Sequence, residues 1–265
     1  MKKCIFQIFL FIAGVSVYGQ STATYDIVFT SNWEAHGPLP GSSAHFTELV
    51  GATHNSNITF FELGGIATPG VEEVAETGAD RTFSNEVNRA ISAGNASQYI
   101  KGPNLFFNGS LRTITIKDVS VDTNHPLISL ISMIAPSPDW IAAVNSISLL
   151  GTNNEWIQNL TMDIFPYDAG TEEGTGYSLN NPPTNPKEPI SSIRGMYTFN
   201  NQKIGTIVFT RTDTPEPVDG GTITGGPFTF TVGDGIADNV SGVTLDGNIG
   251  ENSQWVVTDD QGNIL

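Results

Sequence analysis

Short runs of β-branched and aromatic residues recur along the chain, and they limit what it can fold into. The runs are TYDIVFTS, SNITFFEL, LRTITIKDVSV, PLISLISMI, IAAVNSISLL, LTMDIFPY and QKIGTIVFTRT. Turn-forming residues separate them, supplied by a chain with 28 glycines and 15 prolines. Regularly spaced short strands of this kind are typical of an antiparallel sandwich or barrel. The sequence therefore predicts an all-β fold.

The apolar pattern is regular within most runs but changes at two places. Ile114 and Ile116 alternate with polar residues, whereas Val119 is out of phase, so we expect the strand register to slip near Lys117. The segment 71–93 instead has apolar residues at helical spacing, namely Val71, Val74 and Ala75, then Phe83, Val87 and Ile91. We predict two short helices broken at Gly78 and inserted between strands, with Ser84 or Thr82 capping the second.

The first twenty residues have the pattern of an export signal. Lys2 and Lys3 precede an apolar run over 5–17, and small and polar residues then offer a cleavage point. Such a run is too short and wrongly flanked to be a membrane-spanning helix. Cys4, the one cysteine, lies inside the signal, so the mature chain has no disulfide. We expect a secreted or cell-surface protein, stabilised by its core or by bound metal.

The charge of the mature chain excludes two classes of partner. Without Lys2 and Lys3 the chain keeps nine basic residues against 27 acidic ones, a net charge of −18. Such a surface repels nucleic acid and anionic membranes, and it suits divalent cations. Beyond the signal, no apolar run is long enough to cross a bilayer. The sequence therefore predicts neither a nucleic-acid partner nor a membrane span.

Carboxylates in two loops are the strongest candidates for a functional site. Asp139 interrupts the apolar stretch SMIAPSPDWIAAV, where an unpaired charge would be expensive. Asp168, Glu172 and Glu173 lie in FPYDAGTEEG, whose proline and glycines force a tight loop. Two loops at one end of a sandwich with hard oxygen ligands match the needs of calcium, although no EF-hand loop is present. The alternative is that these are solvated loop acids in an acidic protein.

Four ordered motifs resemble the spondin N-terminal domain family, known from F-spondin and mindin. They are SMIAPSPDWIAAVNSISLL followed by Trp156, then DIFPYDAGTEEG, and upstream SSAHFTELVGATH and GGIATPGVEEVAETG. The family shows Met-Ile-x-Pro-Ser-Pro-Asp-Trp, then a Trp, then Pro-x-Asp-Ala-Gly-Thr-Asp-x-Gly. This chain departs from that pattern at Glu172, where the family usually has Asp, and at Phe46, where it has Trp.

The resemblance implies an eight-stranded antiparallel β-sandwich of the C-two type with short helical insertions. It also implies a calcium ion held by Asp139, Asp168 and Glu172, with Glu173 as the alternative to Glu172. Three residues are assigned structural roles. Trp140 is expected to anchor the Asp139 turn in the core, His54 to be a hydrogen-bonded structural histidine, and Glu76 to be an internal hydrogen-bond acceptor.

The chain divides into four parts on this interpretation. Residues 1–20 are the signal, 24–211 the spondin domain and 212–221 a linker rich in proline and acids. Residues 222–265 form a small β-hairpin tail module that resembles short repeats of secreted Bacteroidetes proteins, which suggests a bacterial source. Because the chain stops directly after the turn DDQGN, we expect this partial repeat to be truncated.

The predicted function is a non-catalytic calcium-binding module for adhesion or recognition outside the cell. Its partner would be an unidentified polysaccharide or a matrix or cell-surface component. One alternative is a structural spacer in a large surface adhesin. Another is an uncharacterised hydrolase, but common catalytic motifs are absent. A zinc site at His36, His45 and His54 is disfavoured because three or four ligands must converge on the ion.

Overall fold

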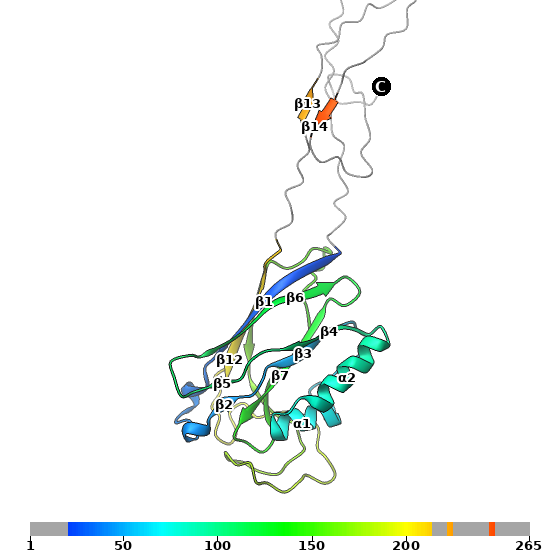
Figure 1. Ribbon diagram of the computed structural model, residues 1–265. Helices are drawn as coiled ribbons and strands as arrows, with labels where there is room; N and C mark the ends of the chain where they lie inside the picture. The colour runs from blue at the N-terminus through cyan, green and yellow to red at the C-terminus, as the bar shows by residue number, and fades with distance from the viewer. Residues whose placement is uncertain (1–20, 214–221, 225–243, 247–265) are drawn as a thin grey trace, which may run out of the picture. The chain divides into compact units, whose positions relative to one another are not determined.

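The computed structural model describes residues 21–213, 222–224 and 244–246. The predicted signal (1–20), the linker residues 214–221 and most of the predicted tail module lie outside the described residues. Strands β1 to β12 belong to a compact unit that spans residues 19–214 (Figure 1). In the tail, β13 (Thr222–Thr224) pairs antiparallel with β14 (Thr244–Asp246).

The compact unit is built on two antiparallel sheets. One has the order β6-β1-β12-β9 and consists of β6 (Thr113–Asp122), β1 (Thr22–Ser31), β12 (Gly205–Arg211) and β9 (Asn159–Ile164). The other has the order β11-β10-β8-β7-β2-β5 and consists of β11 (Ser191–Ser192), β10 (Pro166–Asp168), β8 (Trp140–Ser148), β7 (Leu127–Ala135), β2 (His45–Phe46) and β5 (Leu105–Phe106). In this second sheet β3 (Val50–His54) also pairs with β7, and β4 (Ala96–Lys101) pairs with β3.

This arrangement confirms the predicted all-β sandwich. The sheets contain four and eight strands, and eight of these twelve have five or more residues. The remaining four strands have two or three residues and only extend the second sheet. Two 3-10 turns, Trp33–His36 and Gly41–Ser43, follow β1. Within the described residues, no helix is long and apolar enough to cross a bilayer.

The second sheet is the middle of three layers. Along β8, Trp140, Ala142 and Val144 face the core between the two sheets, whereas Ile141 and Ala143 face a second core under the helices. Successive side chains of a strand point to opposite faces, so a strand covered on both faces is apolar throughout. The continuous apolar stretch around Asp139 is therefore explained by β7 and β8 lying between two cores.

The helical layer consists of α1 (Pro69–Thr77), which contacts β7 and β8, and α2 (Arg81–Ser92), which contacts β4 (Figure 1). Thr68 caps α1, because its hydroxyl accepts the Val71 N–H at 3.2 Å. Gly78 ends α1 in the left-handed conformation, with φ of 71°. The prediction of two helices broken at this glycine is confirmed.

The predicted cap of the second helix is wrong. Helix α2 begins at Arg81 with Asp80 at the N-cap, so neither Thr82 nor Ser84 occupies that position. The carboxylate of Glu73 in α1 accepts the Thr82 N–H at 2.5 Å. In return, Glu86 of α2 accepts the Gly70 N–H near the start of α1 at 2.8 Å. The two helices thus cap each other, which no local pattern in the sequence indicates.

Two further strand predictions have different outcomes. The register slip near Lys117 is confirmed, because β1 and β6 shift between the pairs Tyr25–Val119 and Ile27–Ile116. The run SNITFFEL forms no strand; it is a loop whose Phe60 and Phe61 are buried under the helices. An apolar run covered by helices can be mistaken for a strand, since periodicity cannot separate the two.

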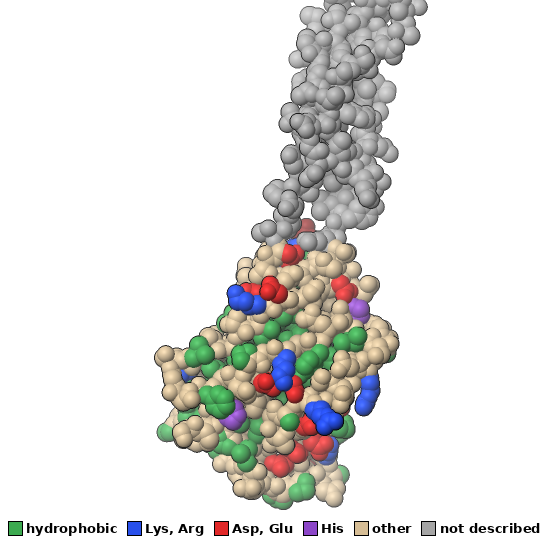
Figure 2. Space-filling view, in the orientation of Figure 1, with side chains coloured by type: hydrophobic (Ala, Val, Ile, Leu, Met, Phe, Trp, Pro, Cys, Tyr) green, Lys and Arg blue, Asp and Glu red, His purple; other side chains and the backbone are tan. Residues whose placement is uncertain are grey.

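Charged side chains of both signs lie close together on the face shown in Figure 2. The ion pairs of the compact unit include Lys101 with Glu48 at 2.7 Å and with Asp80 at 2.8 Å. Asp80 also accepts a hydrogen bond from the Tyr99 hydroxyl, and both Tyr99 and Lys101 belong to β4. These contacts connect the start of α2 to the edge of the second sheet.

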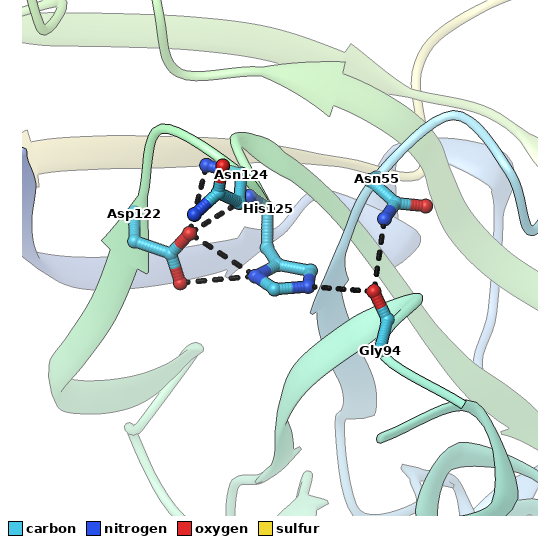
Figure 3. A network of polar contacts seen from close by, with 5 residues as sticks. All are labelled: Asn55, Gly94, Asp122, Asn124 and His125. Atoms are coloured by element: carbon cyan, nitrogen blue, oxygen red, sulfur yellow. Dashed lines mark hydrogen bonds and ion pairs between the residues drawn. The ribbon is translucent and has the colours of Figure 1, made fainter. Parts of the chain in front are cut away.

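A polar network around His125 joins three segments at the other end of α2 (Figure 3). Its Nδ1 lies 3.0 Å from the Asp122 carboxylate, and its Nε2 lies 3.2 Å from the Gly94 carbonyl oxygen. The Asn55 side-chain amide donates to the same carbonyl at 3.1 Å. The turn between β6 and β7 is thereby attached to the residues that follow β3 and α2.

Candidate functional site

Asp139 occupies the turn between β7 and β8 and is completely buried. The turn is shaped by Pro136 and Pro138, and the Ser137 hydroxyl accepts the Trp140 N–H at 3.1 Å. Trp140, the first residue of β8, is also completely buried and packs in the core between the sheets. The tryptophan therefore fixes the start of the strand and, with it, the position of the neighbouring carboxylate.

The two oxygens of the Asp139 carboxylate have different surroundings. Oδ2 accepts the backbone N–H groups of Thr171 at 2.6 Å and Glu172 at 3.1 Å, and it lies 3.2 Å from the Thr171 hydroxyl. Oδ1 is buried and has no hydrogen-bond partner. Burial raises the pKa of Asp139, although the hydrogen bonds from the loop oppose that shift. A buried carboxylate oxygen without a donor is costly unless a cation is next to it.

Asp168 ends β10 directly opposite Trp140 in β8. Its Oδ1 accepts the Gly170 N–H at 2.9 Å. Burial, followed by the negative charge of Asp139, raises the pKa of Asp168 to about 6. The indole N–H of Trp140 is close enough to oppose this shift, but it makes no hydrogen bond of normal geometry. The buried Asp139 and the half-buried Asp168 are thus neighbouring carboxylates, and no basic side chain of the described residues is among the causes that shift the pKa of Asp168.

This shift predicts how stability depends on pH when divalent cations are chelated. The folded-state pKa of Asp168, about 6, is above its ordinary value of 3.8, so the folded chain holds this proton more tightly than the unfolded chain. Stability is therefore lost as pH rises from about 4 to 7. In EDTA we expect Asp168→Asn to melt above the wild type at pH 7.5, with a difference that vanishes near pH 4. A difference in melting temperature that stays constant over this range would contradict the assignment.

The two adjacent glutamates of the loop have different environments. Glu172 is half-buried, its N–H binds Asp139, and the Asn181 amide donates to its Oε2 at 3.4 Å. Burial raises the pKa of Glu172, and the charges of Glu76 and Asp139 raise it further. Glu173 is exposed, and its N–H binds the Pro182 carbonyl instead. By position, Glu172 is the one beside Asp139.

Glu76 lies in the last turn of α1 and belongs to the same acidic cluster. Burial is the main cause of its raised pKa, and the charges of Glu72 and Asp139 contribute. The nearby Thr171 side chain lowers the pKa of Glu76 in opposition to these causes. The Thr171 hydroxyl itself donates to Asp139 Oδ2 at 3.2 Å. Sequence reasoning gave Thr171 no role, although it is part of the quoted Asp-Ala-Gly-Thr motif.

Tyr197 is a second residue of the site that sequence reasoning missed. Its ring stacks on Trp140 with an interplanar angle of 6° and a centroid distance of 5.8 Å, and 47% of the residue is exposed. Burial, then the charges of Asp168 and Asp139, raise the pKa of its hydroxyl. The tyrosine therefore lies at the solvent edge of the carboxylates. No motif in the sequence indicated this position.

His36, His45 and His54 lie in three separate elements, and each contacts other polar groups. His54 in β3 is completely buried, with Nδ1 2.9 Å from the Asn55 carbonyl and Nε2 2.8 Å from the Ser129 hydroxyl. Burial lowers its pKa. His36 in the first 3-10 turn contacts the Lys203 carbonyl, and His45 in β2 contacts the Ser43 carbonyl.

The carboxylates are assembled from three segments, but as placed they do not form a closed cage. Across residues 21–213, 222–224 and 244–246, no three His, Cys, Asp or Glu side chains are close enough to surround one ion. Two observations nevertheless support a cation at this position. The buried Asp139 Oδ1 has no partner, and the groups around it are carboxylates and a hydroxyl, the hard oxygen donors that calcium prefers.

Comparison with known proteins gives a consistent family assignment. The sequence profile of the Spondin_N family matches residues 23–204. Spondin-1 of Gallus gallus is 32% identical over 185 residues, which is 66% of this chain and 22% of that protein, and Spondin-1 of Homo sapiens gives the same values. Spondin-2 of Homo sapiens is 28% identical over 179 residues, covering 66% of this chain and 53% of that protein.

The matched region contains every carboxylate described above. It corresponds to about a fifth of the length of Spondin-1 and about half of the length of Spondin-2. The similarity is thus to one domain of these larger proteins. Because the family profile covers more than half of the chain, the chain belongs to the Spondin_N family.

Proposed function

We propose that this chain is an extracellular, non-catalytic recognition module with a calcium ion bound between the Asp139 turn and the 168–173 loop. The proposal is supported by the membership in the Spondin_N family and by the apolar, basic-flanked start of the sequence, which is typical of an export signal. The partner would be a polysaccharide or a component of the matrix or of a cell surface.

The single observation that carries the calcium part is the buried Asp139 Oδ1 without a donor. Its partner oxygen is fully engaged by the loop, so the carboxylate is held with one oxygen free. Asp168 and Glu172 add two carboxylates whose raised pKa values reflect burial next to like charge. A divalent cation would neutralise all three groups at once, which no described basic side chain does.

Asp139, Asp168 and Glu172 would hold the ion, and Glu173 is disfavoured because it is exposed and its backbone N–H binds the Pro182 carbonyl rather than Asp139. Bound calcium would supply charge neutralisation and a link between two loops. Through the ion, these residues would fix the position of the turn before β8 relative to the loop after β10. We infer that the ion's main contribution is to shape this end of the sandwich for its partner.

The test is thermal unfolding of the full chain in 10 mM calcium and in EDTA, together with calorimetric titration. Extracellular calcium modules have dissociation constants of about 10⁻⁴ to 10⁻³ M. At about 100 times the dissociation constant, the ion should add about 2.7 kcal/mol to the free energy of unfolding. We expect Asp139→Asn and Asp168→Asn to abolish the calcium-dependent rise in melting temperature.

The adjacent glutamates provide a matched pair for this experiment. Glu172→Gln should weaken calcium binding, whereas Glu173→Gln, which removes the same charge one residue later, should leave it close to the wild type. If the wild type shows neither titration heat nor a difference between calcium and EDTA, the calcium proposal is wrong.

A further inference from the structure

We propose that the exposed face of helix α2 is a recognition surface, and that it binds a polysaccharide that carries carboxylate groups. This α2 face consists of Arg81, Asn85, Asn88, Arg89 and Ser92, all of which are exposed. The inference rests on the proposed recognition role. It adds the chemical class of the partner and a contact surface that shares no residue with the calcium site.

The sequence of α2 separates a polar side from a buried one. Residues three or four apart are neighbours on a helix surface, and this spacing connects the five members of the α2 face. The opposite side carries Phe83, Val87 and Ala90, which are buried in the core under the helices. From residue 81 to residue 92 the face extends about 16 Å, at a rise of about 1.5 Å per residue. The α2 face is therefore an elongated polar strip, which suits a polymer better than a small ligand.

The two arginines of the α2 face differ from the other basic residues because they have no partner. Six of the nine basic residues of the mature chain form ion pairs, namely Lys101, Arg112, Lys117, Lys187, Lys203 and Arg211. Arg194 lies over the Phe165 ring at 4.1 Å and donates to the Asn201 carbonyl at 2.8 Å. Among the described residues, none forms a hydrogen bond, ion pair or ring contact with the side chain of Arg81 or Arg89. Both guanidinium groups are thus free to bind an acidic partner.

Acidic residues close to the arginines in sequence are engaged elsewhere. Glu86, the one acid within α2, accepts the Gly70 N–H near the start of α1 at 2.8 Å. Asp80, which precedes Arg81, accepts a hydrogen bond from the Lys101 ammonium at 2.8 Å. The α2 face therefore carries positive charge and has no acidic member, although the chain as a whole is strongly acidic.

Helix stability accounts for one of these arginines but not for the other. Arg89 lies in the last turn of α2, where the helix dipole favours a positive charge. Arg81 is the first residue of α2, where the dipole disfavours a positive charge, and the first turn contains no acid to offset it. The position of Arg81 therefore has no local benefit, and contact with an anionic partner would supply one.

The chemistry of the α2 face selects the class of partner. A guanidinium group matches a carboxylate in a two-bonded geometry. The amides of Asn85 and Asn88 and the hydroxyl of Ser92 both donate and accept hydrogen bonds, as the hydroxyl groups of a sugar require. With Arg89, these three side chains line an open hollow on the helix surface. The face has no large apolar side chain, so it lacks the aromatic or aliphatic anchor that protein partners usually need.

The net negative charge of the chain does not prevent this contact. In physiological salt, charges more than about 8 Å apart in solvent are largely screened from one another. The charges that decide binding are therefore those at the contact itself, which on the α2 face are the two arginines. A polymer with carboxylates spaced along a hydroxyl-rich chain fits this face.

The test is biolayer interferometry of the full chain on immobilised polygalacturonate, with immobilised dextran as the neutral polymer and EDTA present throughout to exclude calcium bridges. We expect the wild type to bind polygalacturonate and not dextran. The double substitution Arg81→Gln and Arg89→Gln should weaken binding about tenfold or more, because two charge-assisted contacts are lost. Lys117→Gln combined with Lys203→Gln removes the same charge from ion-paired lysines outside α2, so it should stay within about twofold of the wild type. Asn88→Asp keeps both arginines but adds a like charge to the hollow, so it should also weaken binding.

The inference is overturned if the wild type does not bind polygalacturonate, binds dextran equally well, or loses no affinity in the arginine double variant. Sedimentation velocity in the same buffer tests another occupant: a wild type that dimerises while the double variant stays monomeric would make a second copy the partner and overturn the polysaccharide. If the double variant does not fold, the affinity of Asn88→Asp decides. Because EDTA is present throughout, failure of the calcium site would leave these results unchanged. Calcium binding without polygalacturonate binding would reject this inference alone.

Discussion

Replacement of Trp140 by alanine is expected to lower the free energy of unfolding by about 3–5 kcal/mol, the usual cost of removing a large buried aromatic side chain. Trp140 is completely buried, and its ring has edge-to-face contacts with Tyr177 and Phe199 at centroid distances of 5.6 and 5.2 Å. The cavity would open next to Asp139, so the calcium-dependent stabilisation should be lost as well. Urea unfolding in calcium and in EDTA measures both effects.

Two variants separate the packing of Trp140 from its polar contact. Trp140→Phe keeps an aromatic ring but removes the N–H beside Asp168, so it should cost less than the alanine variant. Tyr197→Ala removes the half-exposed ring that stacks on Trp140, and it should cost about 1 kcal/mol. If Trp140→Ala unfolds at the same urea concentration as Tyr197→Ala, this tryptophan does not anchor the Asp139 turn to the core.

Gly170→Ala is expected to destabilise the chain by about 2–4 kcal/mol and to weaken calcium binding strongly. Gly170 has φ of 73°, a conformation that costs about 1–2 kcal/mol for a residue with a side chain. Its added methyl group would lie 2.1 Å from the Glu188 carbonyl oxygen, a backbone atom that cannot turn away. Any shift of this residue moves the Thr171 and Glu172 amides that hold Asp139.

Gly176→Ala is the matched control, because Gly176 lies in the same loop region with no atom within 4 Å of the added methyl group. It should leave the unfolding free energy within about 0.5 kcal/mol of the wild type. Chemical denaturation and calorimetric titration are the measurements. Calcium affinity in Gly170→Ala equal to that of Gly176→Ala would show that the loop amides do not position the site.

Some elements of the fold were predictable because the determining residues are neighbours in sequence. The helix break at Gly78 follows from glycine's access to the left-handed conformation, and the slip near Lys117 follows from a change of phase in the apolar residues. Both depend on backbone geometry over a few residues. The all-β class followed in the same way from short runs separated by turn residues.

Other elements were missed because their partners are distant in the chain. The cap of α2 comes from Glu73 in the other helix, so the local candidates Thr82 and Ser84 were wrong. Strand β4, over Ala96–Lys101, was not anticipated, and its partner β3 precedes both helices in the chain. The loop with Phe60 and Phe61 has the amino-acid composition of a strand, yet its aromatic side chains pack under the helices and its backbone pairs with no strand.

The sequence by itself determined the class of fold, the turn that presents Asp139 and the loop that contains Asp168 and Glu172, because proline, glycine and apolar period act locally. Only the tertiary structure decided that one oxygen of Asp139 is free and that Glu172 rather than Glu173 lies beside it. It also decided that Glu76, 63 residues before Asp139, belongs to the same cluster. The hydrogen-bond partners and the neighbouring charges of a carboxylate come from segments that are distant in the chain, and only the packing of the folded chain brings those segments together.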